Sequence, residues 1–272
     1  MLPKINAAFV EKVLVGFIRD ELGRCGCDKA VLGLSGGLDS AVCATLAARA
    51  LGPRQVLGLI MPYGKAFPAD VRDAVSLARR LGIRHETIDI APQIDAYFAA
   101  QPTADRVRRG NKMARERMSI LYDRSGGEGG LVLGTSNKTE LLIGYGTIYG
   151  DMASAVNPMG DLYKTQVRRL AVHLKIPAAI RAKAPTAGLW PGQTDEGEIG
   201  LPYGELDEIL YGLVEGRMSR KALVAAGHKP TAVDRVLRKV RASEFKRHLP
   251  PIAKLSPRSV GHDFLYPYDW GK

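Results

Sequence analysis

The chain has 272 residues, 46% of them hydrophobic, and a formal net charge of +11, which together predict a globular protein with an anionic partner. No apolar run approaches the ~20 residues of a membrane span and the N-terminus carries no signal pattern, so we expect a cytoplasmic protein. The three cysteines, Cys25, Cys27 and Cys43, are too few for a disulfide framework and lack the spacing of a zinc site.

The first two thirds of the chain alternate helices with short apolar strands. An amphipathic helix is predicted over residues 3–22, where its apolar stripe would serve core packing or a subunit contact. The predicted strands are residues 30–32, 55–61, 84–90 and 130–134, and the predicted helices between them are residues 41–48, 68–81 and 105–122. This alternation predicts an α/β fold with a doubly wound parallel sheet, whose ligands bind at the carboxyl ends of the strands.

From Asp195 onward we find no convincing strand, and helices are predicted over residues 203–215, 219–226 and 231–245. We therefore expect one domain over residues 1–272, with an α/β core at 1–190 and a helical C-terminal part at 191–272 that is not independent. Residues 183–200 are rich in Pro, Gly and Thr without periodicity, which predicts a long loop able to close over a site. We call residues 183–200 the lid segment.

The most informative stretch is the glycine-rich turn between the first strand and the helix that follows it. Its glycines let the backbone approach a ligand, the amides at the helix start attract an anion, and Asp39 can hold a cation beside that anion. A tight turn with an aspartate cap is the structural alternative. The turn matches neither the Walker loop nor the dinucleotide-binding fingerprint. The residues expected to surround a phosphate are Gly33, Ser35, Gly36, Gly37, Asp39 and Ser40.

A second turn repeats this logic after the strand at 130–134, where Thr135 follows the strand and Glu140 comes early in the next helix. Plain helix capping by Ser136 or Asn137 would also explain it. However, one carboxylate rarely holds Mg²⁺ alone, and an enzyme that releases pyrophosphate must neutralise several negative charges. We therefore expect Asp39 and Glu140 to share a magnesium ion.

The first turn resembles the Ser-Gly-Gly-x-Asp-Ser loop of the ATP pyrophosphatases, and further motifs narrow the resemblance to NAD synthetases. The whole chain is similar to the synthetase domain of that family, which has an adenine nucleotide alpha hydrolase-like fold. The family adenylates deamido-NAD with ATP and Mg²⁺, releases pyrophosphate, and lets ammonia displace AMP to give NAD. The motifs that match, in order, are residues 134–140 (GTSNKTE), 149–151 (YGD), 157–164 (NPMGDLYK) and 184–187 (APTA).

The resemblance implies a role for each matching residue. Thr135, Lys164 and Thr186 would complete the ATP contacts, and Lys164 would also be catalytic as a positive charge on the phosphates. Asp151 matches an acidic position near the ammonia site, where a carboxylate can accept a proton. Arg115 and Lys246 match positions that contact deamido-NAD. A homodimer is also implied, because the family builds its deamido-NAD site across a two-fold interface.

Three positions depart from the pattern of many ammonia-dependent members. This chain has Ile148 where they carry a lysine, Ala155 where they carry an aspartate, and Phe245 in place of the histidine before Lys246. The adenylating motifs are intact, so these departures concern only how deamido-NAD is bound.

Free ammonia is the expected nitrogen donor, because the chain has no room for the amidase domain of glutamine-dependent members; a separate glutaminase subunit is the alternative. A rival function is a tRNA-modifying ATP pyrophosphatase, for which the basic clusters at residues 106–117 and 235–247 would contact RNA. Charge alone does not decide, but tRNA thiolases need cysteines that this chain lacks. We do not expect a nucleic-acid partner. A second rival, a module that binds ATP without chemistry, does not explain Glu140 and Lys164.

Overall fold

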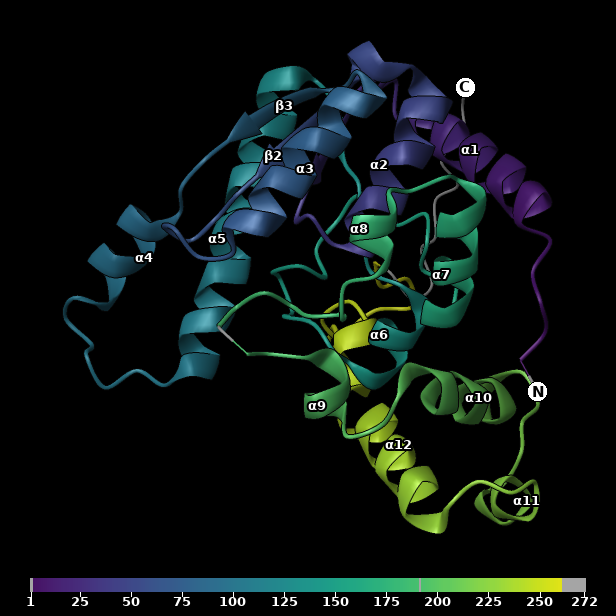
Figure 1. Ribbon diagram of the computed structural model, residues 1–272. Helices are drawn as coiled ribbons and strands as arrows, with labels where there is room; N and C mark the ends of the chain where they lie inside the picture. Colours follow the sequence, from purple (N-terminus) through teal and green to yellow (C-terminus); the bar gives the residue numbers. More distant parts are fainter. Residues whose placement is uncertain (1, 191, 261–272) are drawn as a thin grey trace.

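The computed structural model describes residues 2–190 and 192–260. At its centre is a parallel four-stranded sheet in the order β3-β2-β1-β4, which confirms the predicted sheet (Figure 1). The chain winds from β1 outward to β3 and then returns to the other side of β1 for β4, and ligands bind at such a reversal in open α/β sheets. The strands are β1 (Ala30–Gly33), β2 (Val56–Ile60), β3 (Arg84–Thr87) and β4 (Leu131–Val132).

Helices cover both faces of the sheet, and short 3₁₀ helices occur at η1 (Pro53–Gln55) and η2 (Glu244–Arg247). The α-helices within the described residues are α1 (Ala7–Arg24), α2 (Leu38–Leu51), α3 (Pro68–Leu81), α4 (Ala91–Phe98), α5 (Arg106–Glu128), α6 (Lys138–Ile143), α7 (Lys164–His173), α8 (Ala178–Arg181), α9 (Asp195–Ile199), α10 (Tyr203–Val214), α11 (Arg220–Ala225) and α12 (Pro230–Ala242).

Alternate residues of β1 supply the two halves of the α/β core. Leu32 packs with α1, α2, α3 and α7, whereas Val31 packs with α4 and α5 on the opposite face. The sheet is therefore buried on both sides, which explains the continuous apolar character of β1 and β2.

The C-terminal helices form a second apolar cluster, in which α10, α11 and α12 pack around Tyr203 and against Ile143 of α6. The helical part thus rests on the helix that follows β4. The boundary between residues 190 and 191 and the dependence of the helical part on the core stay predictions, and residues 261–272 lie outside the described residues.

The structure corrects several of the predicted elements. Helix α4 was missed because only Ile94 and Phe98 of it are buried, too few to set a period. Helix α5 runs to Glu128 rather than residue 122, and α12 ends at Ala242, three residues before the predicted end. The lid segment was predicted to lack secondary structure, yet it contains α9, which begins after the N-cap Thr194.

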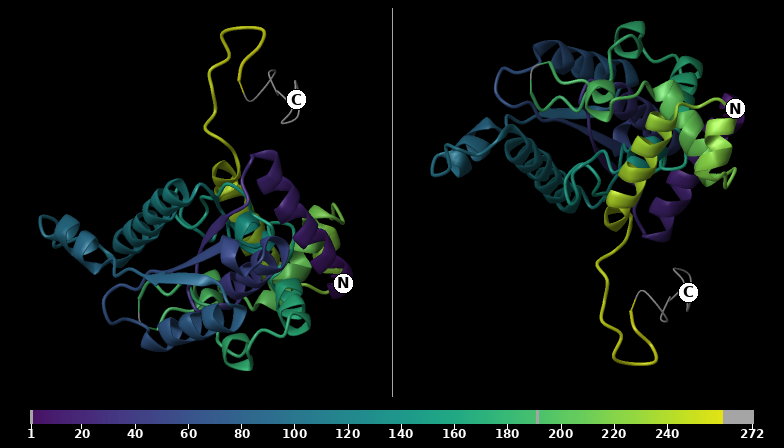
Figure 2. Two further views of the ribbon diagram at one scale, coloured as in Figure 1. Left: turned by 90° about the horizontal axis from the view of Figure 1, so that it is seen from above. Right: turned by 90° about the horizontal axis from the view of Figure 1, so that it is seen from below.

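Helix α1 begins at Ala7 and presents apolar side chains on two sides. Ile18 and Leu22 are buried against the core, whereas Phe9, Val13 and Phe17 remain exposed. Figure 2 shows that α4 projects from the body and that the chain after η2 runs outward. Within residues 2–190 and 192–260, no helix combines the length and apolarity needed to cross a bilayer.

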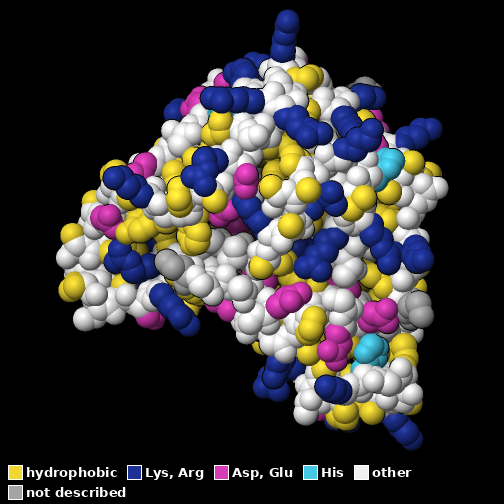
Figure 3. Space-filling model, in the orientation of Figure 1, with side chains coloured by type: hydrophobic (Ala, Val, Ile, Leu, Met, Phe, Trp, Pro, Cys, Tyr) yellow, Lys and Arg dark blue, Asp and Glu magenta, His cyan; other side chains and the backbone are white. Residues whose placement is uncertain are grey.

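The predicted basic clusters do not merge into one stripe on the face drawn in Figure 3, where Lys and Arg side chains are spread with acidic groups between them. Part of the α5 cluster is also paired within the chain. Arg109 contacts Asp95 at 3.3 Å and Lys112 contacts Glu116 at 2.6 Å. Two of the six basic side chains at residues 106–117 are therefore balanced by a carboxylate.

Candidate active site

The glycine-rich turn connects β1 to α2 at the carboxyl edge of the sheet. Gly36 has a φ of +78°, and a Cβ there would collide with the backbone of Asp70, so the turn requires glycine. The Gly37 amide donates to Ser35 Oγ at 3.2 Å, and Ser35 Oγ lies 3.1 Å from Ser40 Oγ. These hydrogen bonds fix the turn at the start of α2. Backbone amides at the start of a helix form a binding site for anions.

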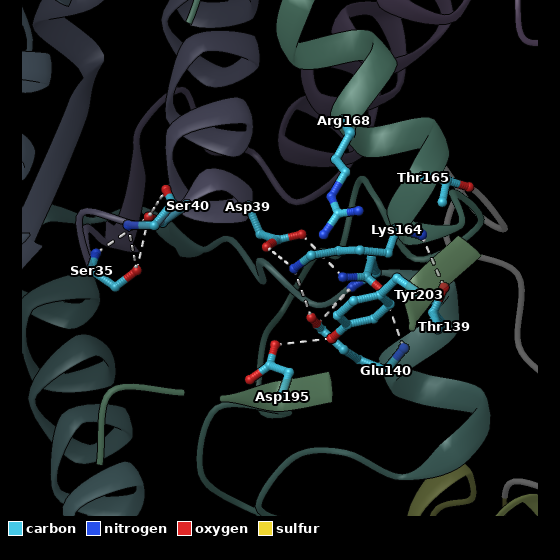
Figure 4. Close-up of polar contacts among 12 residues, drawn as sticks. Ser35, Asp39, Ser40, Thr139, Glu140, Lys164, Thr165, Arg168, Asp195 and Tyr203 are labelled. Carbon is cyan, nitrogen blue, oxygen red and sulfur yellow. Dashed lines mark hydrogen bonds and ion pairs between the residues drawn. The ribbon is translucent and has the colours of Figure 1, made fainter. Parts of the chain in front are cut away.

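The two motifs predicted to share a metal ion meet across the reversal of the sheet. Asn137 caps α6 and donates its side-chain amide to Asp39 Oδ1 at 3.0 Å. The Lys164 ammonium contacts the other Asp39 oxygen and lies 3.2 Å from Glu140 Oε1 (Figure 4). Asp39, Glu140 and Lys164 therefore form one cluster, which with residues 35–40 we call the phosphate end.

Lys164 is held by groups far away in the sequence. Its backbone N–H donates to Thr139 Oγ1 at 2.9 Å, and that hydroxyl donates to Asp207 of α10 at 2.6 Å. Asp207 also accepts from the backbone and hydroxyl of Thr165, at 2.8 and 2.7 Å. Helix α10 thus fixes the start of α7, and the Lys164 side chain is 4% exposed.

Burial dominates the electrostatics of this cluster. It raises the pKa of Glu140 to about 7, against the attraction of Lys164 and with the repulsion of Asp39. Burial opposes the charged form of Lys164, but Asp39 and Glu140 outweigh it and raise the pKa of this lysine. The ammonium therefore stays charged at neutral pH and is available to a polyphosphate.

Asp151 lies at the other end of the pocket, in the turn after α6. Protein atoms around the carboxyl displace part of its water and raise its pKa, although Asp151 is exposed where it lines the pocket. The Thr147 amide donates to Asp151 at 2.8 Å, and the Thr147 hydroxyl donates to Asn111 at 2.7 Å. A carboxylate with a raised pKa suits proton transfer.

The two residues predicted to contact deamido-NAD donate to backbone carbonyls. Lys246 donates to the carbonyls of Gly144 and Gly146 at 2.8 and 2.7 Å, so it braces the turn that carries Asp151. Arg115 is exposed on α5 and donates to the Ile148 carbonyl at 3.3 Å. Asp151, Arg115 and Lys246 form what we call the amidation end.

The lid segment is tied to the phosphate end at its start. Lys183 donates to the Gly36 carbonyl at 3.2 Å and to Asp70 at 2.6 Å, and it also pairs with Asp73 at 2.5 Å. Thr186 is exposed and borders the pocket. The predicted ATP contact is therefore within reach of the phosphate loop.

Further along, the lid segment contacts α5. The Arg106 guanidinium lies 5.1 Å from the centre of the Trp190 ring, and Leu189 and Trp190 pack over Gly110. Trp190 is half-buried there rather than part of a core. Pro191 lies outside the described residues.

One pocket of about 910 Å³ is lined by residues of the phosphate end, the amidation end and the lid segment. Of the predicted site residues, Gly36 and Arg115 do not line it; Gly36 instead shapes the turn through its positive φ. The predicted residues that line it are Gly33, Ser35, Gly37, Asp39, Ser40, Thr135, Glu140, Asp151, Lys164, Thr186 and Lys246.

Four polar residues of the site have no predicted role in it. The sequence identifies Asn137 as a helix cap and as part of the motif at residues 134–140, and Lys183 as the start of the lid segment. Asp195 and Tyr203 received no role, yet the Tyr203 ring lies 5.3 Å from the Lys164 ammonium and its hydroxyl donates to Asp195 at 2.9 Å. Acidic residues are common in the first turn of a helix, because they stabilise its N-terminus. The sequence therefore gives Asp195 no special role, and only the three-dimensional contacts show that it belongs to the site.

Comparison with known proteins identifies the family. The NAD synthase family model matches residues 10–250. The chain is 53% identical over 268 residues to the NH₃-dependent NAD⁺ synthetase of Trichlorobacter lovleyi, covering 98% of both chains. The chain belongs to the NAD synthase family. This agrees with the motifs at residues 134–140 and 157–164, and it makes the chain a ligase rather than a tRNA-modifying enzyme.

The chain is also similar to solved structures of synthetases. The NMN synthetase of Francisella tularensis matches with a TM-score of 0.80 and 36% identity, over 92% of this chain and 99% of that one. The NH₃-dependent NAD synthetase of Campylobacter jejuni, in complex with nitrate ion, gives a TM-score of 0.79 and 34% identity, over 92% and 100%. The adenine nucleotide alpha hydrolase-like fold expected from the resemblance is thereby confirmed.

Proposed function

We propose that this chain amidates deamido-NAD to NAD, using ATP and ammonia and releasing AMP and pyrophosphate. The observation that carries the proposal is the pocket that Asp39, Glu140 and Lys164 of the phosphate end line together with Asp151. A family member 53% identical over nearly its whole length bears the name of this activity.

In the first half of the reaction, an oxygen of the nicotinate carboxylate attacks the α-phosphorus of ATP. The bond between that phosphorus and the bridging oxygen breaks, and pyrophosphate leaves. The amides at the start of α2 and the Lys164 ammonium stabilise the charge on the departing pyrophosphate. Thr135 and Thr186 donate hydroxyl hydrogen bonds to the phosphate oxygens.

The residues at the phosphate end fit a magnesium ion. Asp39 and Glu140 converge on one cation, the Lys164 ammonium, so two carboxylates already face a common point. Among residues 2–190 and 192–260, no three His, Cys, Asp or Glu side chains form a metal-binding group. Phosphate oxygens and water would supply the remaining ligands of an ion held by Asp39 and Glu140. When bound, the ion would neutralise charge on the phosphates.

In the second half, ammonia attacks the carbonyl carbon of the adenylated nicotinate. The bond from that carbon to the AMP oxygen breaks, AMP leaves, and a proton from the attacking nitrogen goes to Asp151. The raised pKa of Asp151 makes its carboxylate a better proton acceptor than an ordinary aspartate. Nitrogen comes from free ammonia, or from a separate glutaminase subunit that delivers it.

Deamido-NAD binding involves Arg115 and Lys246 and is completed in a homodimer. The exposed apolar face of Phe9, Val13 and Phe17 on α1 supports a subunit contact, because such a face gains free energy when it is covered. Light scattering at assay concentration should give a dimer, and Val13→Glu should shift it toward monomer. A fully active wild-type monomer would contradict this part of the proposal.

We also propose that the reaction takes place in the cytoplasm.

The test is product formation from ATP, Mg²⁺ and ammonium with three alternative acceptors. Deamido-NAD should give equal amounts of AMP, pyrophosphate and NAD. Nicotinate mononucleotide is the second acceptor, because a similar structure is named an NMN synthetase, and bulk tRNA is the third. AMP formation on tRNA but not on deamido-NAD would reject the proposed function.

A further inference from the structure

Asp195, the first residue of α9, is a buried acid with an unsatisfied oxygen. Its side chain is 4% exposed, and Oδ2 accepts from the Tyr203 hydroxyl at 2.9 Å. Oδ1 is buried and has no hydrogen-bond partner among the described residues. The Tyr145 hydroxyl also interacts with the Asp195 carboxylate, but its single proton is donated to Glu198 at 2.7 Å, so Oδ1 gains no donor from it. A buried carboxylate oxygen without a donor is costly, so it needs an explanation beyond folding.

Asp195 borders the phosphate end. It lines the same pocket as Asp39, Glu140 and Lys164, and Figure 4 shows it beside Tyr203 and Glu140. Its backbone N–H donates to the Pro185 carbonyl at 2.9 Å. This hydrogen bond joins the two ends of the loop between Pro185 and Asp195 in the lid segment. Asp195 is thus held next to Thr186, at the base of that loop.

The charges of this group call for a further cation. The Lys164 ammonium is ion-paired with Asp39 and Glu140, and Asp195 interacts with it only over a longer distance. When all three carboxylates are ionised, they exceed the charge of this one ammonium by two. The Arg168 guanidinium stacks on the Tyr203 ring at 5.6 Å, but its partner is Glu196, 3.9 Å away. A divalent ion between Asp39 and Glu140 would balance the excess.

We propose that Asp195 is a third acidic residue of the magnesium site, supplied by the lid segment, which raises the affinity for the ion without contacting it directly. The inference rests on the metal site of the proposed function. No three acidic side chains among the described residues form a direct ligand set, so Asp195 acts through its charge and through water on the hydrated ion. It is a positioning residue, and it makes metal affinity depend on the lid segment.

The test is Mn²⁺ binding, measured by electron paramagnetic resonance in the presence of α,β-methylene-ATP, which cannot be cleaved at the α–β bond. Asp195→Asn should weaken Mn²⁺ binding about 10- to 100-fold. Without metal, in EDTA, Asp195→Asn should bind the analogue with wild-type affinity. A general distortion of the pocket would weaken this binding as well. Asp195→Glu, which keeps the charge, should recover part of the affinity. Glu205→Gln on α10 is the matched control and should bind Mn²⁺ like the wild type.

Wild-type Mn²⁺ affinity in Asp195→Asn would overturn the inference. If Asp39→Asn, measured alongside, loses Mn²⁺ affinity, the metal site of the proposed function still stands. Wild-type affinity in Asp39→Asn would instead reject the metal site of the proposed function. Should Asp195→Asn fail to fold, the wild type gives a second measurement. With the analogue bound, Mn²⁺ should slow tryptic cleavage after Lys183, because coupling between metal and lid segment is reciprocal. Equal cleavage with Mn²⁺ and with EDTA would also overturn the inference.

Discussion

The phosphate end and the amidation end of one pocket are built in different ways. At the phosphate end, Asp39, Glu140 and Lys164 come from three elements and bond to one another through side chains. At the amidation end, Arg115 and Lys246 donate to backbone carbonyls of the turn that carries Asp151. The geometry of the phosphate end therefore depends on the identity of these three side chains. The geometry of the amidation end depends more on the backbone conformation of the turn.

This difference is consistent with the three departures expected from the resemblance to the family. Ile148, Ala155 and Phe245 all lie near the turn or next to Lys246, and none belongs to the phosphate end. Side chains around a backbone-built site can change while its carbonyls stay in place. Loss of Lys164 would instead leave the buried carboxylates of Asp39 and Glu140 without their cation, which costs about 3 to 5 kcal/mol.

The largest expected effect comes from breaking the phosphate end. Asp39→Asn and Glu140→Gln should each lower the rate of pyrophosphate formation about 100- to 1,000-fold, because each removes a carboxylate assigned to the metal. Circular dichroism should show an intact fold, since neither side chain belongs to an apolar cluster. Pyrophosphate release at a near-normal rate in either variant would contradict the assignment.

Asp151→Asn should separate the two ends. NAD formation should fall about 100-fold because the proton acceptor is lost, whereas the first release of pyrophosphate should persist. Rapid-quench measurement of both products gives the two rates. Asp161→Asn, which alters an exposed aspartate, is the control and should leave both unchanged. Equal loss of both products in Asp151→Asn would mean that the ends do not act separately.

The buried charge of Glu140 should also appear in the stability of the metal-free protein. Its folded pKa of about 7 lies above the ordinary value of 4.5, so the folded state holds a proton that the unfolded state releases between these pH values. In EDTA, the wild type should therefore lose unfolding free energy relative to Glu140→Gln as pH rises from about 4.5 to 7, by on the order of 1 to 3 kcal/mol. The unfolding free energies of the wild type and Glu140→Gln are measured by urea denaturation at several pH values. The same pH dependence in both proteins would refute this prediction.

The smallest expected effect concerns the lid segment where it rests on α5. Trp190 fluorescence should change when ATP, Mg²⁺ and deamido-NAD bind together, because closing the site excludes water from the adenylate. Gly110→Val should reduce that change and lower activity a few-fold, since even a Cβ would lie 2.9 Å from Leu189 Cδ1. Fluorescence indifferent to ligands would leave the lid segment without a role in closure.

The sequence was sufficient for the parts of the site that follow strands. Ser35 to Ser40 and Thr135 come directly after β1 and β4, and a parallel sheet brings its carboxyl ends together, so their proximity followed from the pattern. Contacts across long separations did not follow from it. Lys164 meets Asp39, 125 residues away, because α10 positions the start of α7 through Asp207.

The helix missed in the lid segment had a physical reason as well. Helix α9 spans only Asp195–Ile199, too short for any hydrophobic period, and it depends on the Thr194 cap and on contacts with Tyr203. Asp195 could not be recognised as a buried acid without that helix.

The most direct test of the division between the two ends is a rapid-quench experiment on the wild type without ammonium. Enzyme mixed with ATP, Mg²⁺ and deamido-NAD should release a burst of about one pyrophosphate per active site and no NAD, because the phosphate end is complete without the nitrogen donor. Ammonium added afterwards should convert the bound adenylate to NAD and start turnover. If no pyrophosphate appears until ammonium is present, adenylation is not a separate step and the two ends do not work independently.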